Sequence, residues 1–121
     1  MRHYTRLSEI QADIEANELT CSQLVDSYLQ NIETSKGLNA FLEVFDDEAR
    51  QRAEEVDQKI KDGKEGRLAG LVIAIKDNIC YKGHKLSAAS KILEGFESLF
   101  TATALQRLID EDAIVIGRTN C

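Results

Sequence analysis

The stretch Leu71-Val72-Ile73-Ala74-Ile75, followed at once by Lys76, decides the fold class of this chain. It is apolar throughout and has the length of a strand, which predicts a strand buried on both faces. A second apolar run, Ala113-Ile114-Val115-Ile116, predicts another buried strand downstream. Between the two runs, Thr103 is the predicted N-cap of a helix. A strand, a crossing helix and a second strand are typical of an α/β sheet with a parallel pair of strands.

The part of the chain before these strands is predicted to be mainly helical. Ser8 and Thr20 are each followed three residues later by glutamine, a capping-box pattern that predicts the starts of two helices. Residues 40–45 are rich in aromatic and β-branched side chains, which favours a short strand. Asp46 is the predicted N-cap of a third helix, which we expect to end at Asp62-Gly63.

The predicted elements divide the chain at the turn after the third helix. Residues 1–62 form the predicted N-terminal helical region, and residues 63–121 form the start of an incomplete α/β core. We expect both to be part of one domain, because 121 residues is a typical length for a single domain. The chain stops directly after its second apolar run, whereas complete domains usually end in exposed polar segments. We therefore expect an N-terminal fragment of a longer protein.

Composition and charge argue against several classes of protein. With 43% hydrophobic and 30% charged residues, the chain is typical of soluble globular domains. Its formal net charge of −6 argues against a domain that binds nucleic acid by itself through the phosphates. It has neither an apolar run near the roughly 20 residues of a membrane span nor the apolar core of a signal peptide. The odd, scattered set Cys21, Cys80 and Cys121 favours reduced thiols in a cytoplasmic protein.

Lys76 is the candidate catalytic residue. It lies at the carboxyl end of a predicted buried strand, where α/β sheets place ligands and reactive groups. Apolar surroundings there would favour its neutral amine, which can act as a base. The structural alternative, which the pattern alone favours, is a lysine whose side chain extends from the strand end to water. Asp77 either pairs with this lysine or begins the following loop.

Two further sets of polar residues are weaker candidates. Ser87, Ser90 and Lys91 are similar to the serine–lysine pairs of some hydrolases, but their spacing differs from the S-x-x-K pattern on a helix. A polar loop is therefore the better interpretation. Cys80 and His84 offer only two metal ligands, whereas a structural zinc site needs four. We predict neither a metal site nor a cofactor-binding residue in this chain.

The segment from Gly66 to Ile79, Gly-Arg-Leu-Ala-Gly-Leu-Val-Ile-Ala-Ile-Lys-Asp-Asn-Ile, resembles the signature of the amidase signature enzymes, G-x-L-x-G-[IVL]-P-[IV]-x-[IV]-K-D-N-[IF]. Gly83 and the runs 90–94 and 114–120 follow in that family's order, so the resemblance covers nearly the whole chain. The family usually has proline at the position of Val72, and valine suits a buried strand. The resemblance implies an α/β fold in which N-terminal helices precede the first strands of a mixed sheet flanked by helices, truncated here.

In that family a serine attacks an amide carbonyl, a second serine in a cis peptide relays the proton, and a lysine is the terminal base. The resemblance assigns this lysine to Lys76, the residue selected above from its place on the strand. A serine hydroxyl is a weak nucleophile without such assistance. Both serines belong to a glycine- and serine-rich segment that in the family lies beyond the position of Cys121. We therefore expect residues 1–121 alone to be inactive.

Within the family, the run 90–94 is most similar to the glutaminase (A) subunits of bacterial tRNA-dependent amidotransferases. This similarity implies release of ammonia from glutamine for transamidation of misacylated Glu-tRNA(Gln) or Asp-tRNA(Asn). It also implies a B subunit that uses ATP and Mg²⁺ to activate the tRNA and a C subunit that clamps the two, with tRNA bound only through the complex. Two alternatives remain open: a partner-independent amidase of small amides, and a non-catalytic short protein that binds a partner through its N-terminal helices.

Overall fold

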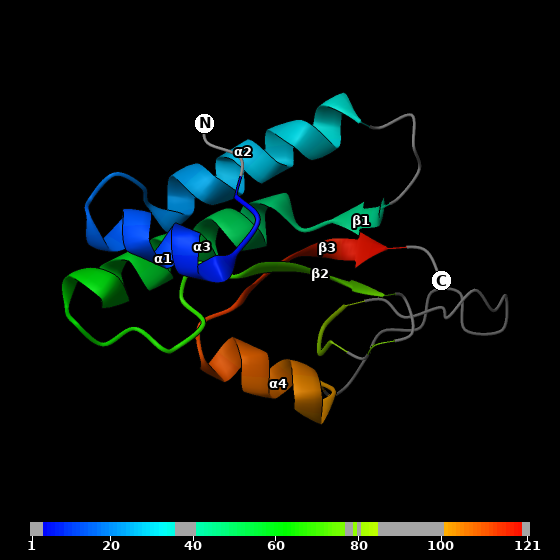
Figure 1. Ribbon diagram of the computed structural model, residues 1–121. Coiled ribbons are helices and arrows are strands. Elements are labelled where there is room, and N and C mark those ends of the chain that lie inside the picture. Colours follow the sequence, from blue (N-terminus) through cyan, green and yellow to red (C-terminus); the bar gives the residue numbers. More distant parts are fainter. Residues whose placement is uncertain (1–3, 36–40, 77–78, 80, 85–100, 120–121) are drawn as a thin grey trace, which may run out of the picture.

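The chain folds into a mixed β-sheet with helices on both faces (Figure 1). The computed structural model describes residues 4–35, 41–76, 79, 81–84 and 101–119. In chain order the elements are α1 (Leu7–Glu15), α2 (Cys21–Thr34), β1 (Phe41–Val44), α3 (Asp46–Lys61), β2 (Val72–Lys76), α4 (Thr103–Asp110) and β3 (Ile114–Thr119). The predicted α/β class is confirmed. Within the described ranges, no helix combines the length and apolar character needed to cross a membrane.

The three strands lie in the order β1-β3-β2, with β3 in the centre. β2 runs parallel to β3 and α4 lies between them in the chain, as predicted from the two apolar runs. β1 runs antiparallel on the other side of β3, so the sheet takes one strand from residues 1–62 and two from residues 63–121. Every residue of β3 except Thr119 is buried, because this strand has neighbours on both sides and helices on both faces.

The prediction that the first apolar run is buried on both faces is wrong. Ile73 and Ile75 pack with Leu105 of α4 on one face of the sheet, and of these two only Ile75 is fully buried. On the opposite face Val72 reaches the cluster beneath α2 and α3, whereas Ala74 is exposed. β2 is an edge strand of the described sheet, so one of its sides has no neighbouring strand to cover it.

Two apolar clusters pack the helices against the sheet, and a third, formed by Ile10, Leu19 and Leu24, packs α1 against α2. The larger lies between α2, α3 and one face of the sheet, and its completely buried members are Cys21, Val25, Ala53, Val56 and Ile114. The smaller lies between α4 and the other face, and its buried members are Phe45, Ile75, Leu105 and Val115. Successive residues of β3, Ile114 and Val115, thus face opposite clusters, as side-chain alternation along a strand requires. Figure 1 shows the same division, with α1, α2 and α3 on one side of the sheet and α4 on the other.

The start of α2 confirms the predicted capping box. The Thr20 hydroxyl accepts a hydrogen bond from the backbone N–H of Gln23 at 3.1 Å, and the Gln23 side chain accepts from the backbone N–H of Thr20 at 3.0 Å. Both groups would otherwise lack a partner within the helix.

The predicted caps at Ser8, Asp46 and Thr103 are wrong, because each lies inside the first turn of its helix. The N-caps are instead Arg6, Phe45 and Ala102, and none of them makes a side-chain capping bond. Tertiary packing sets the start of α3. Phe45 is buried in the α4-side cluster, and its backbone N–H donates to the carbonyl of Ile116 at 2.8 Å.

The amino end of α2 is also capped by a neighbouring helix. Asp57 on α3 accepts hydrogen bonds from the backbone N–H groups of Cys21 at 2.7 Å and Ser22 at 3.0 Å, and from the Ser22 hydroxyl at 2.8 Å. With Thr20 accepting from Gln23, the first three N–H groups of the helix all have acceptors. Because these groups cannot bond within the helix, Asp57 allows α2 to begin inside the core at Cys21, which is completely buried.

We expect Cys21 to be unreactive in the folded protein. Burial, reinforced by the negative charge of Asp57, raises the pKa of its thiol from 9.0 to about 12. The thiolate is the nucleophile, so an alkylating reagent at neutral pH should modify Cys21 only after denaturation. Mass spectrometry of the labelled peptides measures this, with urea-unfolded protein as the control. Labelling of Cys21 in native protein as fast as in urea would contradict the prediction.

The raised pKa of Cys21 also has a consequence for stability at alkaline pH. The protonated thiol favours the folded state below pH 9, and this contribution is lost as the pH rises from 9 toward 12.

Candidate functional site

β2 and β3 end at the same side of the sheet (Figure 1), and Lys76 is the last residue of β2. Because these strands are parallel, their carboxyl ends meet at the same edge, and Lys76 is aligned with Thr119, the last residue of β3. The Thr119 hydroxyl donates a hydrogen bond to the carbonyl of Ile75 at 3.3 Å, which ties the two strand ends together. The prediction that Lys76 ends a strand is confirmed.

The side chain of Lys76 is exposed. Side chains alternate along a strand, so Lys76 shares a face with the exposed Ala74 and lies opposite Ile75, which packs in the α4-side cluster. The described residues thus do not enclose the amine in the apolar surroundings that the sequence argument required. Because the amine is exposed, a substrate or another protein segment can approach it directly from solvent.

A row of aligned residues connects Lys76 to the far side of the sheet. Thr119 is aligned with Lys76 on one side and with Phe41 of β1 on the other. Neighbouring strands lie about 4.8 Å apart, so the α-carbons of Lys76 and Phe41 are separated by about 10 Å. The three strands therefore all contribute a residue to this edge.

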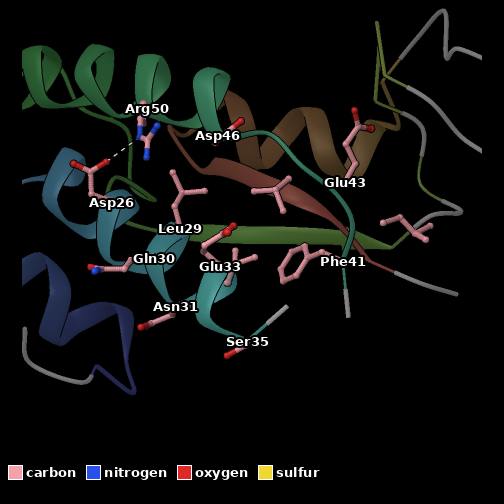
Figure 2. Close-up of a pocket in the computed structure, with 13 residues that line it drawn as sticks. Asp26, Leu29, Gln30, Asn31, Glu33, Ser35, Phe41, Glu43, Asp46 and Arg50 are labelled. Atoms are coloured by element: carbon pink, nitrogen blue, oxygen red, sulfur yellow. Dashed lines mark hydrogen bonds and ion pairs between the residues drawn. The ribbon is translucent and has the colours of Figure 1, made fainter. Parts of the chain in front are cut away.

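A groove of about 960 Å³ opens beside Phe41, between α2, β1 and the start of α3 (Figure 2). Its apolar lining residues are Leu29, Ile32, Phe41, Leu42 and Val44, and its carboxylates are Asp26, Glu33, Glu43 and Asp46. Arg50 is its only described basic residue, and its Nε lies 3.1 Å from a carboxylate oxygen of Asp26. The groove is thus an apolar cavity with an acidic rim. Its described lining residues all lie between Asp26 and Arg50, but they belong to three different elements, so the pattern of a single helix or strand does not predict the groove.

Arg118 is a buried charged residue near this edge that the sequence analysis did not single out. Its side chain is 8% exposed, and its Nη2 lies 3.6 Å from a carboxylate oxygen of Glu43 on β1. It is aligned with Ile75, one position before the pair formed by Lys76 and Thr119. Its only signal in the sequence is a charge two residues after a buried apolar run.

Most of the other candidate residues lie outside the described part of the chain. These are Asp77, Cys80, Ser87, Ser90 and Lys91. His84 is described, and its ring contacts the carboxylate of Glu48 and the carbonyl of Lys82. Across residues 4–35, 41–76 and the later described segments, no group of three or more His, Cys, Asp or Glu side chains is arranged to hold a metal ion.

Comparison with known proteins gives consistent matches. A family model described as Amidase matches residues 23–121. The A subunit of the glutamyl-tRNA(Gln) amidotransferase of Chlorobaculum parvum is 48% identical over 118 residues, covering 97% of this chain and 24% of that protein. The corresponding subunit from Brachyspira hyodysenteriae is 42% identical over 116 residues, covering 93% of this chain and 24% of that protein. The chain spans about a quarter of the length of the curated relatives that it matches.

Solved structures show the same arrangement of helices and strands. A native peptide amidase from Stenotrophomonas maltophilia matches with a TM-score of 0.86 and 35% identity, covering 96% of this chain and 24% of that one. A bacterial aryl acylamidase of the amidase signature family matches with a TM-score of 0.88 and 26% identity, covering 98% of this chain and 25% of that one. The fold of the described residues is therefore the fold of a part of these enzymes.

Proposed function

This chain belongs to the amidase signature family, and we propose that it is the amino-terminal part of the amidase subunit of a tRNA-dependent amidotransferase. The intact subunit would release ammonia from glutamine for transamidation of misacylated Glu-tRNA(Gln) or Asp-tRNA(Asn). The match over residues 23–121 supports the amidase chemistry. The names of the two relatives described above support the amidotransferase assignment.

The observation that carries the proposal is the position of Lys76 at the shared edge of β2 and β3. Its side chain is exposed, and its backbone lies one interstrand spacing, about 5 Å, from that of Thr119, the last residue of β3. In the family, the catalytic serines come after this point in the sequence. A nucleophilic serine and its relay serine would therefore enter the site beside Lys76.

We assign Lys76 the role of terminal base in a Ser-cisSer-Lys mechanism. The nucleophilic serine oxygen forms a bond to the amide carbon of glutamine, while its proton passes through the relay serine to Nζ of Lys76. The proton then returns to the departing nitrogen as the carbon–nitrogen bond breaks, which releases ammonia and leaves a γ-glutamyl ester. Water hydrolyses this ester to glutamate and restores the serine. A neutral lysine amine can serve this cycle because it both accepts and returns a proton.

We propose that the remaining steps belong to partner subunits. A B subunit would use ATP and Mg²⁺ to activate the misacylated tRNA, and a C subunit would clamp the two larger subunits in a cytoplasmic complex. The net charge of −6 supports a subunit that leaves the tRNA phosphates to its partners. No cofactor is assigned to residues of this chain.

The test uses the intact protein that contains residues 1–121, assayed with and without its B and C partners. We expect ammonia release from glutamine, and transamidation only when both partners, ATP and misacylated tRNA are present. Residues 1–121 alone should release no ammonia, because the proposed serines are absent. An intact protein that hydrolyses no glutamine in the complete complex would contradict the proposed function. Ammonia release by residues 1–121 that is lost in Lys76→Ala would contradict the need for downstream serines.

A second candidate is an amidase that acts on small amides without any partner. The close fold similarity to a peptide amidase and an aryl acylamidase favours it. Two measurements separate the candidates: copurification of B- and C-type subunits with the intact protein, and hydrolysis of an aryl amide by the protein alone. Rapid aryl amide hydrolysis without copurifying subunits would select this second function.

A further inference from the structure

We propose that His84 and Glu48 form a clasp that positions the end of the strand carrying Lys76. The catalytic consequence of the clasp rests on the proposed function, whereas the clasp itself rests on contacts among described residues. Nε2 of His84 lies 2.8 Å and 3.0 Å from the two carboxylate oxygens of Glu48, which is thirty-six residues earlier in the chain on α3. Nδ1 of His84 lies 2.9 Å from the carbonyl oxygen of Lys82. Both partners offer acceptor oxygens to the ring nitrogens of His84.

Aromatic packing fixes the orientation of the His84 ring. The ring lies parallel to that of Tyr81, with centroids 3.9 Å apart and an interplanar angle of 5°. On another side it contacts Phe45, with centroids 4.6 Å apart. The side chain of His84 is only 12% exposed. These contacts direct Nε2 at Glu48 and leave the ring little freedom to turn away.

Two backbone hydrogen bonds and apolar packing order the described residues between Lys76 and the clasp. The carbonyl of Lys76 accepts from the N–H of Ile79 at 3.0 Å, and the carbonyl of Tyr81 accepts from the N–H of His84 at 3.0 Å. Ile79 and Tyr81 pack against the same apolar cluster as Ile75, the residue before Lys76. The lysine is therefore held on its amino side by the pairing of β2 with β3. Of the residues that follow it, the described ones are anchored by the apolar cluster and by the contact of His84 with Glu48.

This arrangement makes His84 and Glu48 positioning residues. Glu48 is 58% exposed, and a polar contact with so exposed a partner contributes little to global stability. Loss of the clasp should therefore loosen the segment after Lys76 without unfolding the protein. A lysine amine that is displaced by a fraction of an ångström transfers protons poorly, whereas substrate binding elsewhere in the site is unaffected.

The experiment compares His84→Ala, Glu48→Ala and Glu48→Gln in the intact protein. Glu54→Gln is the matched control, because Glu54 is an exposed glutamate on the same helix. Amide hydrogen exchange of the peptide containing residues 79–84, the thermal midpoint, and kcat and KM for glutamine hydrolysis are measured for each variant. In His84→Ala and Glu48→Ala we expect exchange about 10-fold faster, a fall in kcat of roughly 10- to 100-fold and a KM within about twofold of the parent. The thermal midpoint should stay almost unchanged in Glu48→Ala and should fall in His84→Ala, which also loses the packing of the ring on Tyr81 and Phe45. Glu48→Gln keeps an acceptor oxygen and should retain part of the lost kcat, and the control should match the parent.

Two results would overturn the proposal. Unchanged exchange of residues 79–84 in His84→Ala and in Glu48→Ala would show that no clasp exists. Faster exchange with unchanged kcat would show that the clasp does not position Lys76. If the intact protein has no glutaminase activity at all, the proposed function fails, and the exchange measurement still decides whether the clasp exists.

Discussion

Replacing Lys76 by alanine in the intact protein should lower kcat for glutamine hydrolysis by roughly 1000-fold or more, with little change in KM. A base that acts only during proton transfer contributes to the transition state and not to ground-state binding, so its loss appears in kcat. Lys76 is exposed and is the last residue of β2, an edge strand of the described sheet. Removal of its side chain should therefore not disturb the core. Steady-state kinetics with the thermal midpoint as a check on folding measures the effect.

Three controls separate a catalytic lysine from an ordinary surface lysine. Lys64→Ala removes a positive charge from the exposed turn after α3 and should leave kcat unchanged. Lys76→Arg keeps the charge but cannot offer a neutral base, so it should be as inactive as Lys76→Ala. A small primary amine added to Lys76→Ala should restore part of the activity. If Lys76→Ala keeps kcat within about tenfold of the parent, the side chain is a lysine that merely extends to water.

Replacing Asp112 by alanine should lower the free energy of unfolding by about 3 kcal/mol, the second large effect. The Asp112 side chain is 1% exposed, and one of its oxygens accepts from Nζ of Lys59 at 2.8 Å and from Nη2 of Arg52 at 3.1 Å. The other oxygen accepts from the backbone N–H of Gly66 at 2.6 Å. This carboxylate thereby joins α3, the connection to β2 and the turn before β3. Without it, the N–H of Gly66 loses its acceptor.

The surroundings of Gly66 prevent the chain from closing over the lost carboxylate. A β-carbon at this position would lie 2.6 Å from the backbone of Glu111, so the two backbones already pack as closely as they can. Lys59 and Arg52 are partly exposed and can turn toward water, which limits the cost of their lost contacts. Most of the expected decrease in the free energy of unfolding therefore comes from leaving the N–H of Gly66 without an acceptor.

Further variants at Asp112 separate the carboxylate from the backbone. This residue has a φ of 76°, which alanine adopts at a cost of about 1 kcal/mol, whereas glycine adopts it freely. Asp112→Gly should thus destabilise less than Asp112→Ala, and Asp112→Asn, which keeps one acceptor oxygen, should lose least. Asp110→Ala is a matched control, because Asp110 is an exposed aspartate two residues earlier. Urea unfolding measures each variant, and an Asp112→Ala protein within about 0.5 kcal/mol of the parent would contradict the assignment.

The lowered pKa of Asp112 predicts that the folded protein loses stability in acid. Burial by itself would raise the pKa of Asp112, but the hydrogen bonds from Lys59 and Gly66 and the charges of Lys59 and Arg52 hold it below its ordinary value of 3.8. A depressed pKa means that the stabilising contribution is present above pH 3.8 and is lost as the pH falls below it. The difference in the free energy of unfolding between the parent and Asp112→Asn should therefore become smaller as the pH falls through that range.

Local patterns in the sequence were sufficient to predict the α/β class and the order of the elements. The two apolar runs predicted β2 and β3, and the helix predicted from Thr103 between them predicted their parallel arrangement across α4. Thr20 and Gln23 predicted the start of α2, because a capping box involves only residues close together in the chain. The position of Lys76 at a strand end followed from the abrupt end of the apolar run.

Only the tertiary structure decided the features whose partners are distant in the sequence. Phe45, anchored in the core, sets the start of α3 in place of the predicted cap at Asp46. Whether the apolar run of β2 is buried depends on its place at an edge of the described sheet, which composition does not encode. In the sequence His84 is only a weak candidate metal ligand, and its contact with Glu48 exists only because folding brings α3 to its ring. Periodicity and capping act over a few residues, whereas burial and ion pairing depend on which segments the fold brings together.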